Sequence, residues 1–305
     1  MIANQMALLK REFWEHRSIW VAPAAIAFVS VLLTATGLVI GSNFKEVVNL
    51  AIVGASNVGE GERRAMITAA LSGFIAIFVI AMWILTIFYC LDALYAERKD
   101  KSILFWRSLP ITDTETVVSK LLIAVIVIPA VTFVAIVASQ LLSLIIMSIW
   151  ISVQGGSPGH LLWDFGALFD VWTFTLFFIL SIPLWLAPLI GWFLFVSAFT
   201  KRSPLLVAFL PIFVVPALER MVFGTSLLFD AIFVRSFKTP LFGNLNLPGE
   251  LIDEDHFQMS AEMMSIMSLV DFSGFLLSPS LWIGFLVCGL FATAAVFVRR
   301  YRDDS

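Results

Sequence analysis

The stretch of sequence that decides the fold is LLIAVIVIPAVTFVAIVASQLLSLIIMSIWISV, residues 121–153. It contains no Asp, Glu, Lys, Arg or His. A helix that crosses a bilayer needs about 20 mostly apolar residues to pass through roughly 30 Å of hydrocarbon. This run is longer than that, so we expect its helix to tilt, to bend at Pro129 or to project from the membrane.

The composition of the whole chain agrees with a run embedded in lipid. Of its 305 residues, 60% are apolar and 13% are charged, whereas soluble domains average roughly 45–50% apolar and about 25% charged residues. The mean hydropathy is +0.97. Cys90 and Cys288 both lie in apolar runs, so the sequence indicates no disulfide framework. The chain is therefore predicted to be an all-α polytopic membrane protein.

Six apolar runs have interiors without Asp, Glu, Lys, Arg or His. They are residues 19–42, 67–91, 121–153, 171–200, 204–218 and 275–298. The fifth run is the shortest and also contains Pro204, Pro211 and Pro216. Since proline removes a helical hydrogen bond, we expect the helices to bend or break at Pro183, Pro188, Pro211 and Pro216.

The positive-inside rule orients these runs. With the N-terminus inside, most basic residues fall on the cytoplasmic side. These residues are Lys10, Arg11, Arg17, Arg98, Lys99, Lys101, Arg107, Lys120, Lys201, Arg202, Arg299, Arg300 and Arg302. An odd number of crossings would move the last of these clusters outside. The charges therefore predict six transmembrane helices with both termini cytoplasmic.

Three segments of this single transmembrane domain, residues 1–305, lie outside the apolar runs. In residues 1–18, Ile2, Met6, Leu9 and Phe13 recur at three- and four-residue steps. This pattern predicts a short amphipathic helix on the inner membrane surface, with a frayed polar lead-in as the alternative. The other two segments are a cytoplasmic loop at 92–120 and an external segment at 219–274.

Within the cytoplasmic loop, Ser102 is placed to cap a short helix over 103–109 that Pro110 would end. Thr112 or Asp113 is expected to cap the helix that leads into the third span. Phe105 and Trp106 give the short helix more aromatic surface than a free loop needs, which suits docking on another protein. The alternative is that these two side chains lie at the membrane interface.

The sequence lacks motifs that would indicate nucleotide binding or metal-dependent catalysis. There is no phosphate-binding G-x-x-x-x-G-K-[S/T] loop and no H-E-x-x-H. We therefore expect no catalytic, cofactor or metal site in this chain, and no enzymatic activity of its own. The spans also lack the ionisable groups that ion-coupled transporters use. Gln140 is more typical of a helix–helix hydrogen bond than of a ligand site.

One loop pattern resembles a known family. Ala96-Glu97-Arg98, Ser102, Ser108-Leu109-Pro110-Ile111 and Ser119-Lys120-Leu121 are similar to the loop between the second and third spans of type-2 ATP-binding-cassette (ABC) exporter permeases. The likeness extends to the N-terminal helix, the six spans and the external segment after the fifth. It implies that the loop is a coupling helix for a separate ATPase. The coupling residues would be Glu97, Arg98, Ser102, Phe105, Trp106, Arg107, Leu109 and Pro110.

The resemblance further implies a transporter of two permease chains, the same or homologous, and two ATPase subunits. ATP and Mg would belong to the ATPase, the chain's other contact would be membrane lipid, and no nucleic acid is expected. The N-terminal helix 1–18 would connect to the coupling helix, and the external segment would cap the translocation path. This external segment is longer here than the compact helical hairpin of the family. The expected location is the plasma membrane, as a multi-pass protein of the bacterial inner membrane.

Small residues offer places for helices to approach closely. Gly37 and Gly41 form a G-x-x-x-G in the first span, and Ala187 and Gly191 have the same spacing in the fourth. Such spacing suits packing between permease chains or within one chain. In the external segment, the acidic residues at 250–256 and the methionines at 259–267 are expected to form a solvated loop and a packing surface.

Two other functions remain open from the sequence. One is a stand-alone channel or secondary transporter, and the other is a membrane assembly protein that transports nothing. The apolar, aromatic spans favour a lipid-like, drug-like or hydrophobic peptide cargo over a bare ion.

Overall fold

The computed structural model describes residues 2–41, 46, 59–101, 111–237, 239, 241 and 270–301. Over these residues the chain is helical with short connections, and no strand occurs among them. The all-α fold class predicted from the sequence is therefore confirmed for the described part.

Among the described residues, six helices are long and apolar enough to cross a membrane. They comprise Ser18–Ile40, Met66–Lys99, Asp113–Val153, Phe165–Trp185, Pro204–Phe223 and Pro279–Tyr301. Large apolar side chains such as Phe28, Ile77 and Leu286 are exposed along them, which is typical of surface that faces lipid. These helices indicate a multi-pass membrane protein.

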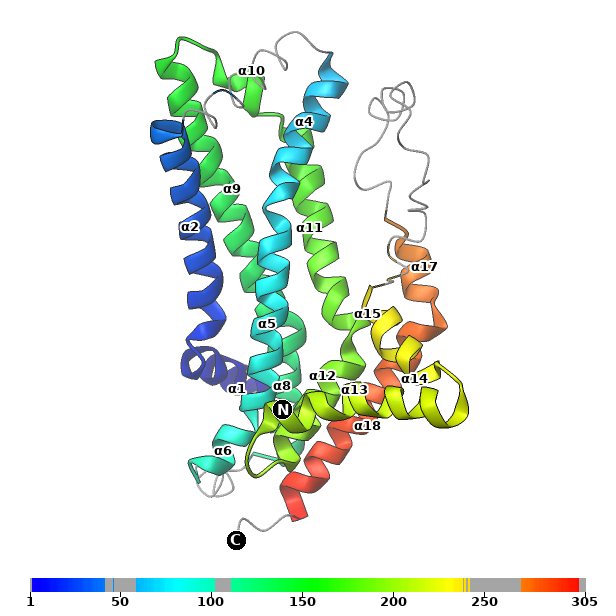
Figure 1. The fold of residues 1–305 in the computed structure, drawn as a ribbon. Helices are drawn as coiled ribbons and strands as arrows, with labels where there is room; N and C mark the ends of the chain where they lie inside the picture. The colour runs from blue at the N-terminus through cyan, green and yellow to red at the C-terminus, as the bar shows by residue number, and fades with distance from the viewer. Residues whose placement is uncertain are drawn as a thin grey trace.

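The long helices α2 (Ser18–Ile40), α5 (Ile75–Ala93), α9 (Ile128–Val153) and α11 (Phe165–Trp185) run side by side in Figure 1. Before α5, α4 (Glu60–Gly73) extends the same helix line, and α10 (Pro158–Leu162) joins α9 to α11. Their inward side chains form one apolar core that includes Phe78, Met82 and Ile136.

The third run forms one continuous helical segment with a local irregularity. It begins with α8 (Asp113–Leu122), where Thr112 and Glu115 make a capping box, so the predicted cap is confirmed. A π-helical turn, η1 (Ile123–Val127), then leads into α9. Pro129 lacks an N–H and its ring crowds the carbonyl of Val125, and a widened turn relieves this conflict. The 41 residues from Asp113 to Val153 span about 60 Å, so this helix extends beyond the hydrocarbon.

The fourth run breaks beside Pro188, so the predicted bend or break at this proline is confirmed. Instead of one helix over 171–200, the chain forms α11 and then α12 (Ala187–Phe199), with a break at Leu186. Pro188 cannot donate to the carbonyl of Leu184, so the helix ends and a new one begins with proline in its first turn. Pro183 lies inside α11, which continues for two more residues.

Helices α12 and α18 (Pro279–Tyr301) pack in parallel. Gly191 lies against the backbone of Cys288, Trp192 contacts the ring of Phe291, and Ala198 and Ala295 share a buried cluster. Gly191 is therefore used for packing within the chain, and Ala187 of the same small pair is buried. Because the two helices run the same way, the chain between Thr200 and Pro279 has to return to the opposite end.

Helix α13 (Pro204–Phe223) lies across the other long helices rather than along them (Figure 1). It continues through Pro211 and Pro216, so the helix does not break at either proline, and a bend there stays a prediction. After it come α14 (Leu227–Phe229), the π-turn η2 (Asp230–Val234) and α15 (Arg235–Phe237). The acidic and methionine residues predicted at 250–267 lie outside the described residues, and α17 (Phe272–Leu277) precedes α18.

The N-terminal segment is helical, as predicted, over α1 (Ile2–Glu15). Leu8 is buried, whereas Met6 is 69% exposed, so the buried stripe is rotated from the one that the sequence spacing predicted. Helix α1 packs on α8, and the C-terminal part of α18 packs on the same helix. Both ends of the described chain therefore lie at one end of the bundle.

Candidate functional site

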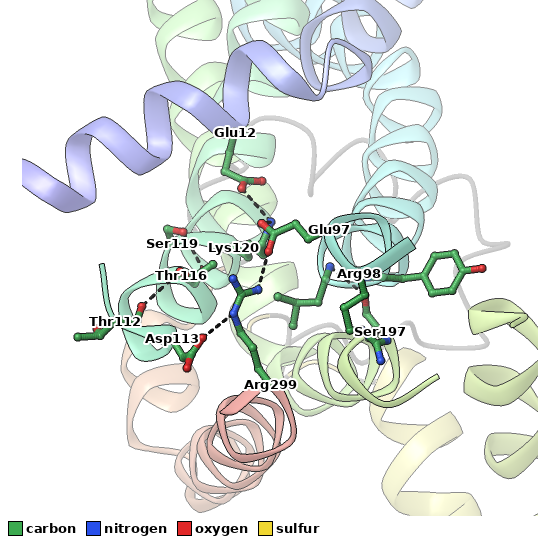
Figure 2. A network of polar contacts seen from close by, with 12 residues as sticks. Glu12, Glu97, Arg98, Thr112, Asp113, Thr116, Ser119, Lys120, Ser197 and Arg299 are labelled. Carbon is green, nitrogen blue, oxygen red and sulfur yellow. Dashed lines mark hydrogen bonds and ion pairs between the residues drawn. The ribbon is translucent and has the colours of Figure 1, made fainter. Parts of the chain in front are cut away.

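Four buried charged side chains from four elements meet at the base of the bundle (Figure 2). They are Glu12 of α1, Glu97 of α6 (Tyr95–Lys99), Lys120 of α8 and Arg299 of α18. Each is at most 5% exposed. Lys120 Nζ lies 2.8 Å from Glu12 Oε1 and 3.0 Å from Glu97 Oε1. Arg299 Nη1 donates to Glu97 Oε2 at 2.5 Å. We call these four residues the base network.

Further polar groups extend the base network toward its surroundings. Arg299 Nε donates to Asp113 Oδ1 at 2.8 Å, and Tyr89 donates its hydroxyl to Glu12 Oε2 at 3.1 Å. Arg11 pairs with Glu15 and lies 3.7 Å from Glu97. The network thus joins α1, α5, α6, α8 and α18, segments that are far apart in the sequence.

The charges of the base network balance, since two carboxylates face two cations. Moving an ion out of water costs several kcal/mol, which is recovered only when partners and hydrogen bonds are well placed. The geometry meets that condition, because each carboxylate has a cation within 3.0 Å. Such a site is stable with all members present, and loss of one member leaves an uncompensated buried charge.

Local sequence explains how each side chain reaches the network. Glu12 follows Leu8 by one helical turn, so it shares the inward face of α1. On α8, the capping box at Thr112 begins a helix that turns Lys120 inward together with Val117. Arg299 follows the buried Ala295 by one turn of α18.

A second set of contacts fixes α6 against α12. Ser197 is fully buried, and its hydroxyl accepts from the N–H groups of Leu94 and Tyr95 at 3.0 and 2.9 Å. Those N–H groups lie where α5 ends and α6 begins. Arg98 Nη2 donates to the carbonyls of Ser197 and Thr200 at 2.6 and 2.7 Å. A cation is favourable at this C-terminal end of α12, where carbonyls lack helical partners.

The predicted coupling residues fall into two groups. Glu97 and Arg98 are described, and their side chains turn inward to partners in the chain, so a contact with another protein stays a prediction. Ser102, Phe105, Trp106, Arg107, Leu109 and Pro110 lie outside the described residues, as does the predicted helix 103–109.

The predicted packing glycines lie at the end of α2 that is far from α1. Gly37 and Gly41 are partly buried, and the Gly41 N–H donates to the Gly37 carbonyl at 3.1 Å. Nothing in the single chain tests packing against a second copy, so this role stays a prediction.

Gln140 joins three helices in the upper part of the bundle. Its Nε2 donates to the Leu71 carbonyl at 3.0 Å, and its Oε1 accepts from Trp172 Nε1 at 2.9 Å. The predicted helix–helix hydrogen bond is therefore confirmed. Near the same end, Arg64 of α4 pairs with Asp170 of α11.

Sequence reasoning missed Glu12 and Arg299 as site residues, and it treated Lys120 only as part of a motif. One signal was available: Glu12 falls on the apolar stripe beside Leu8 and Leu9, where a charge needs a buried partner. The sequence contains no comparable signal that identifies the partner of Glu12, because residues far apart in the sequence come together only in the tertiary fold. Among the described residues, no group of three His, Cys, Asp or Glu side chains could hold a metal ion.

Comparison with known proteins identifies no relative: no protein-family model, characterised protein or solved structure matches this chain.

Proposed function

We propose that this chain is the permease subunit of a type-2 ABC exporter. It would form a translocation path as a dimer and receive motion from a separate ATPase. The family pattern in the loop, from Ala96-Glu97-Arg98 to Ser119-Lys120-Leu121, supports this assignment together with the six long apolar helices of the described part of the chain. ATP and Mg would be bound by the ATPase. The proposed location is the bacterial inner membrane, with both termini cytoplasmic.

The base network is the observation that carries the proposal. The segment 102–110 is bordered by α6, which contributes Glu97, and by α8, which contributes Asp113 and Lys120. Both borders are bound to α18 through Arg299, α8 is bound to α1 through the Lys120–Glu12 pair, and Glu97 of α6 lies 3.7 Å from Arg11 of α1. A force applied to the loop would therefore act on the N-terminal helix, the long third helix and the last helix together.

This arrangement suggests a division of roles within the proposed coupling site. Phe105, Trp106 and their neighbours in 102–110 would contact the ATPase. Glu97 and Arg98 would fix the N-terminal border of the loop to the bundle. Glu97 does so through Arg299, and Arg98 through the carbonyls of Ser197 and Thr200. Buried ion pairs offset their desolvation only while their partners stay well placed, so a movement at one border of the loop would be unfavourable for the whole network.

The experiment is purification of the tagged chain from native membranes in a mild detergent. We expect an ATPase to co-purify in a stoichiometric amount and to hydrolyse ATP. Phe105→Ala and Trp106→Ala should weaken co-purification or uncouple hydrolysis. Trp282→Ala is the matched control, because Trp282 is 58% exposed on α18 and lies outside the loop. Thermal stability of every variant separates lost coupling from lost folding, and this matters most for Glu97→Ala.

A chain that purifies alone without ATPase activity would overturn the proposal. A flux assay in liposomes would then separate the two other functions. Ion or solute flux by the chain alone would favour a stand-alone channel or secondary transporter. The absence of flux would favour a membrane assembly protein.

A further inference from the structure

An apolar cavity of about 430 Å³ lies between α12, α13, η2 and α18. Its lining includes Leu189, Trp192, Ile212, Ile232 and Val287. The volume falls within the range of about 300–1,000 Å³ that is common for small-molecule sites. Among the described residues that line it, Arg235 is the only charged one. A cation on an apolar wall needs a specific reason, since burial of an unpaired charge is unfavourable.

The break between α11 and α12 creates the anchor for Arg235. In a continuous helix the Trp185 carbonyl would accept from the N–H of Leu189, but that N–H donates to the Leu186 carbonyl at 3.0 Å. The freed Trp185 oxygen accepts from Arg235 Nε at 3.1 Å and from Nη2 at 3.0 Å. Arg235 Nη1 donates to the Ser280 carbonyl at 2.8 Å.

Two more contacts fix the position of the guanidinium. Its carbon lies 4.2 Å from the centre of the Trp185 ring, and the Trp185 indole N–H donates to the Arg235 carbonyl at 2.7 Å. Gly284 leaves the space that the guanidinium needs, because a Cβ at this position would collide with Arg235 Nη2. The guanidinium is thus fixed at the cavity wall by neutral groups, which do not compensate its positive charge.

The guanidinium retains capacity for a ligand. Each of its two terminal nitrogens carries two N–H groups, and one on each is used for Trp185 or Ser280. All its hydrogen-bond partners in the described chain are neutral carbonyls, and no described carboxylate pairs with it. Two N–H groups in a planar fork suit the oxygens of a phosphate or carboxylate.

We propose that this cavity binds an anionic amphiphile, with the acidic headgroup at Arg235 and the hydrocarbon chain along the apolar lining of α12, α13 and α18. The cavity offers one cationic group and an otherwise apolar wall, which matches a molecule that has one acidic end and one hydrocarbon end. The site lies within a single chain and does not depend on the proposed transport role.

The test is native mass spectrometry of the delipidated chain in detergent, titrated with lipids of identical acyl chains. The anionic probe is phosphatidylglycerol, the zwitterionic probe is phosphatidylcholine, and inorganic phosphate tests the free anion. We expect the first binding step to favour phosphatidylglycerol by about tenfold or more, since a charge-assisted hydrogen bond to the headgroup is gained.

Two variants change the two halves of the site separately. Arg235→Gln should bring the two lipids to nearly equal affinity. Val287→Phe keeps Arg235 and its carbonyl partners but fills the cavity, so it should abolish the first binding step for both lipids. This second variant keeps the test valid if Arg235→Gln folds poorly. Arg220→Gln is the matched control, since Arg220 is exposed on α13 outside the cavity, and it should leave the preference unchanged.

Three results would overturn the proposal. One is an Arg235→Gln chain that keeps its preference for phosphatidylglycerol. Another is a Val287→Phe chain that binds both lipids as the unaltered chain does. The third is inorganic phosphate that binds as tightly as the anionic lipid, because the apolar lining would then contribute nothing.

Discussion

Lys120 connects the two carboxylates of the base network. Among the described residues, it is the only cation that lies within 3.0 Å of both Glu12 and Glu97. Lys120→Met keeps most of the length and the unbranched apolar stem of the side chain and removes the charge. Glu12 would then lose its closest cation, while Glu97 would keep Arg299 and, at 3.7 Å, Arg11. We expect the free energy of unfolding to fall by about 3–5 kcal/mol, measured by detergent-phase denaturation followed by circular dichroism.

The matched control for this prediction is Lys99→Met, which removes an exposed lysine from the neighbouring α6. Its effect should stay within about 0.5 kcal/mol. The double variant Glu12→Gln with Lys120→Met should recover part of the loss, since it removes the unpaired carboxylate as well. A Lys120→Met chain as stable as the control would show that the network does not hold the helices together.

Individual residues differ in how far the sequence predicts their roles. Gln140 was predictable, because an amide inside an apolar run has to find a hydrogen bond, and neighbouring helices are the nearest source. Thr112 was predictable for a local reason, since capping depends on residues three positions away. Arg299 was not, because its partner Glu97 is separated from it by most of the chain, and sequence spacing carries no information on that pairing.

At the scale of elements, the contact between α12 and α18 depends on a missing side chain. A Cβ on Gly191 would lie 3.0 Å from Cys288 Cα and 3.1 Å from its carbonyl oxygen. Gly191→Leu should therefore push the two helices apart and lower stability by about 1–3 kcal/mol, as overpacking of a tight contact does. The measurement is thermal unfolding of the purified chain.

Gly289 provides the control for this contact on the same helix pair. It lies on α18, one residue after Cys288, and a Cβ there would meet nothing within 4 Å. Gly289→Leu should be neutral or slightly stabilising, since glycine is a poor helix former. If both substitutions had the same effect, the tight contact would not be the reason.

The elements also show where periodicity and composition stop being informative. The apolar runs gave the long helices, because lipid-facing and buried positions both select apolar residues. The break at Leu186 was predictable from the neighbouring Pro188, although α11 and α12 are apolar on both sides of it. The uniform apolar composition hid the direction of α13, whose side chains are compatible with a helix along the bundle or across it. Helix direction is set by tertiary packing and not by composition.

For the whole molecule, the base network places both ends of the described chain at one end of the bundle, and α10 lies at the other (Figure 1). With the positive-inside rule, this arrangement predicts sidedness. Single cysteines at Lys10, Arg300 and Ser157 can report it, since all three residues are exposed. The native Cys90 and Cys288 are buried, so they contribute little background.

An impermeant maleimide should label Ser157→Cys in intact cells, and Lys10→Cys and Arg300→Cys only after permeabilisation. Labelling of the two ends from opposite sides would contradict the base network, because Glu12 and Arg299 could not then share Glu97 and Lys120.

Thr225→Cys, just after α13, tests which segment between Thr200 and Pro279 crosses the membrane. Because α12 and α18 are parallel, the chain has to return between Thr200 and Pro279. Labelling of Thr225 from outside would assign that return to α13, as the sequence predicts. Labelling only after permeabilisation would assign α13 to the inner surface and the crossing to the chain that follows.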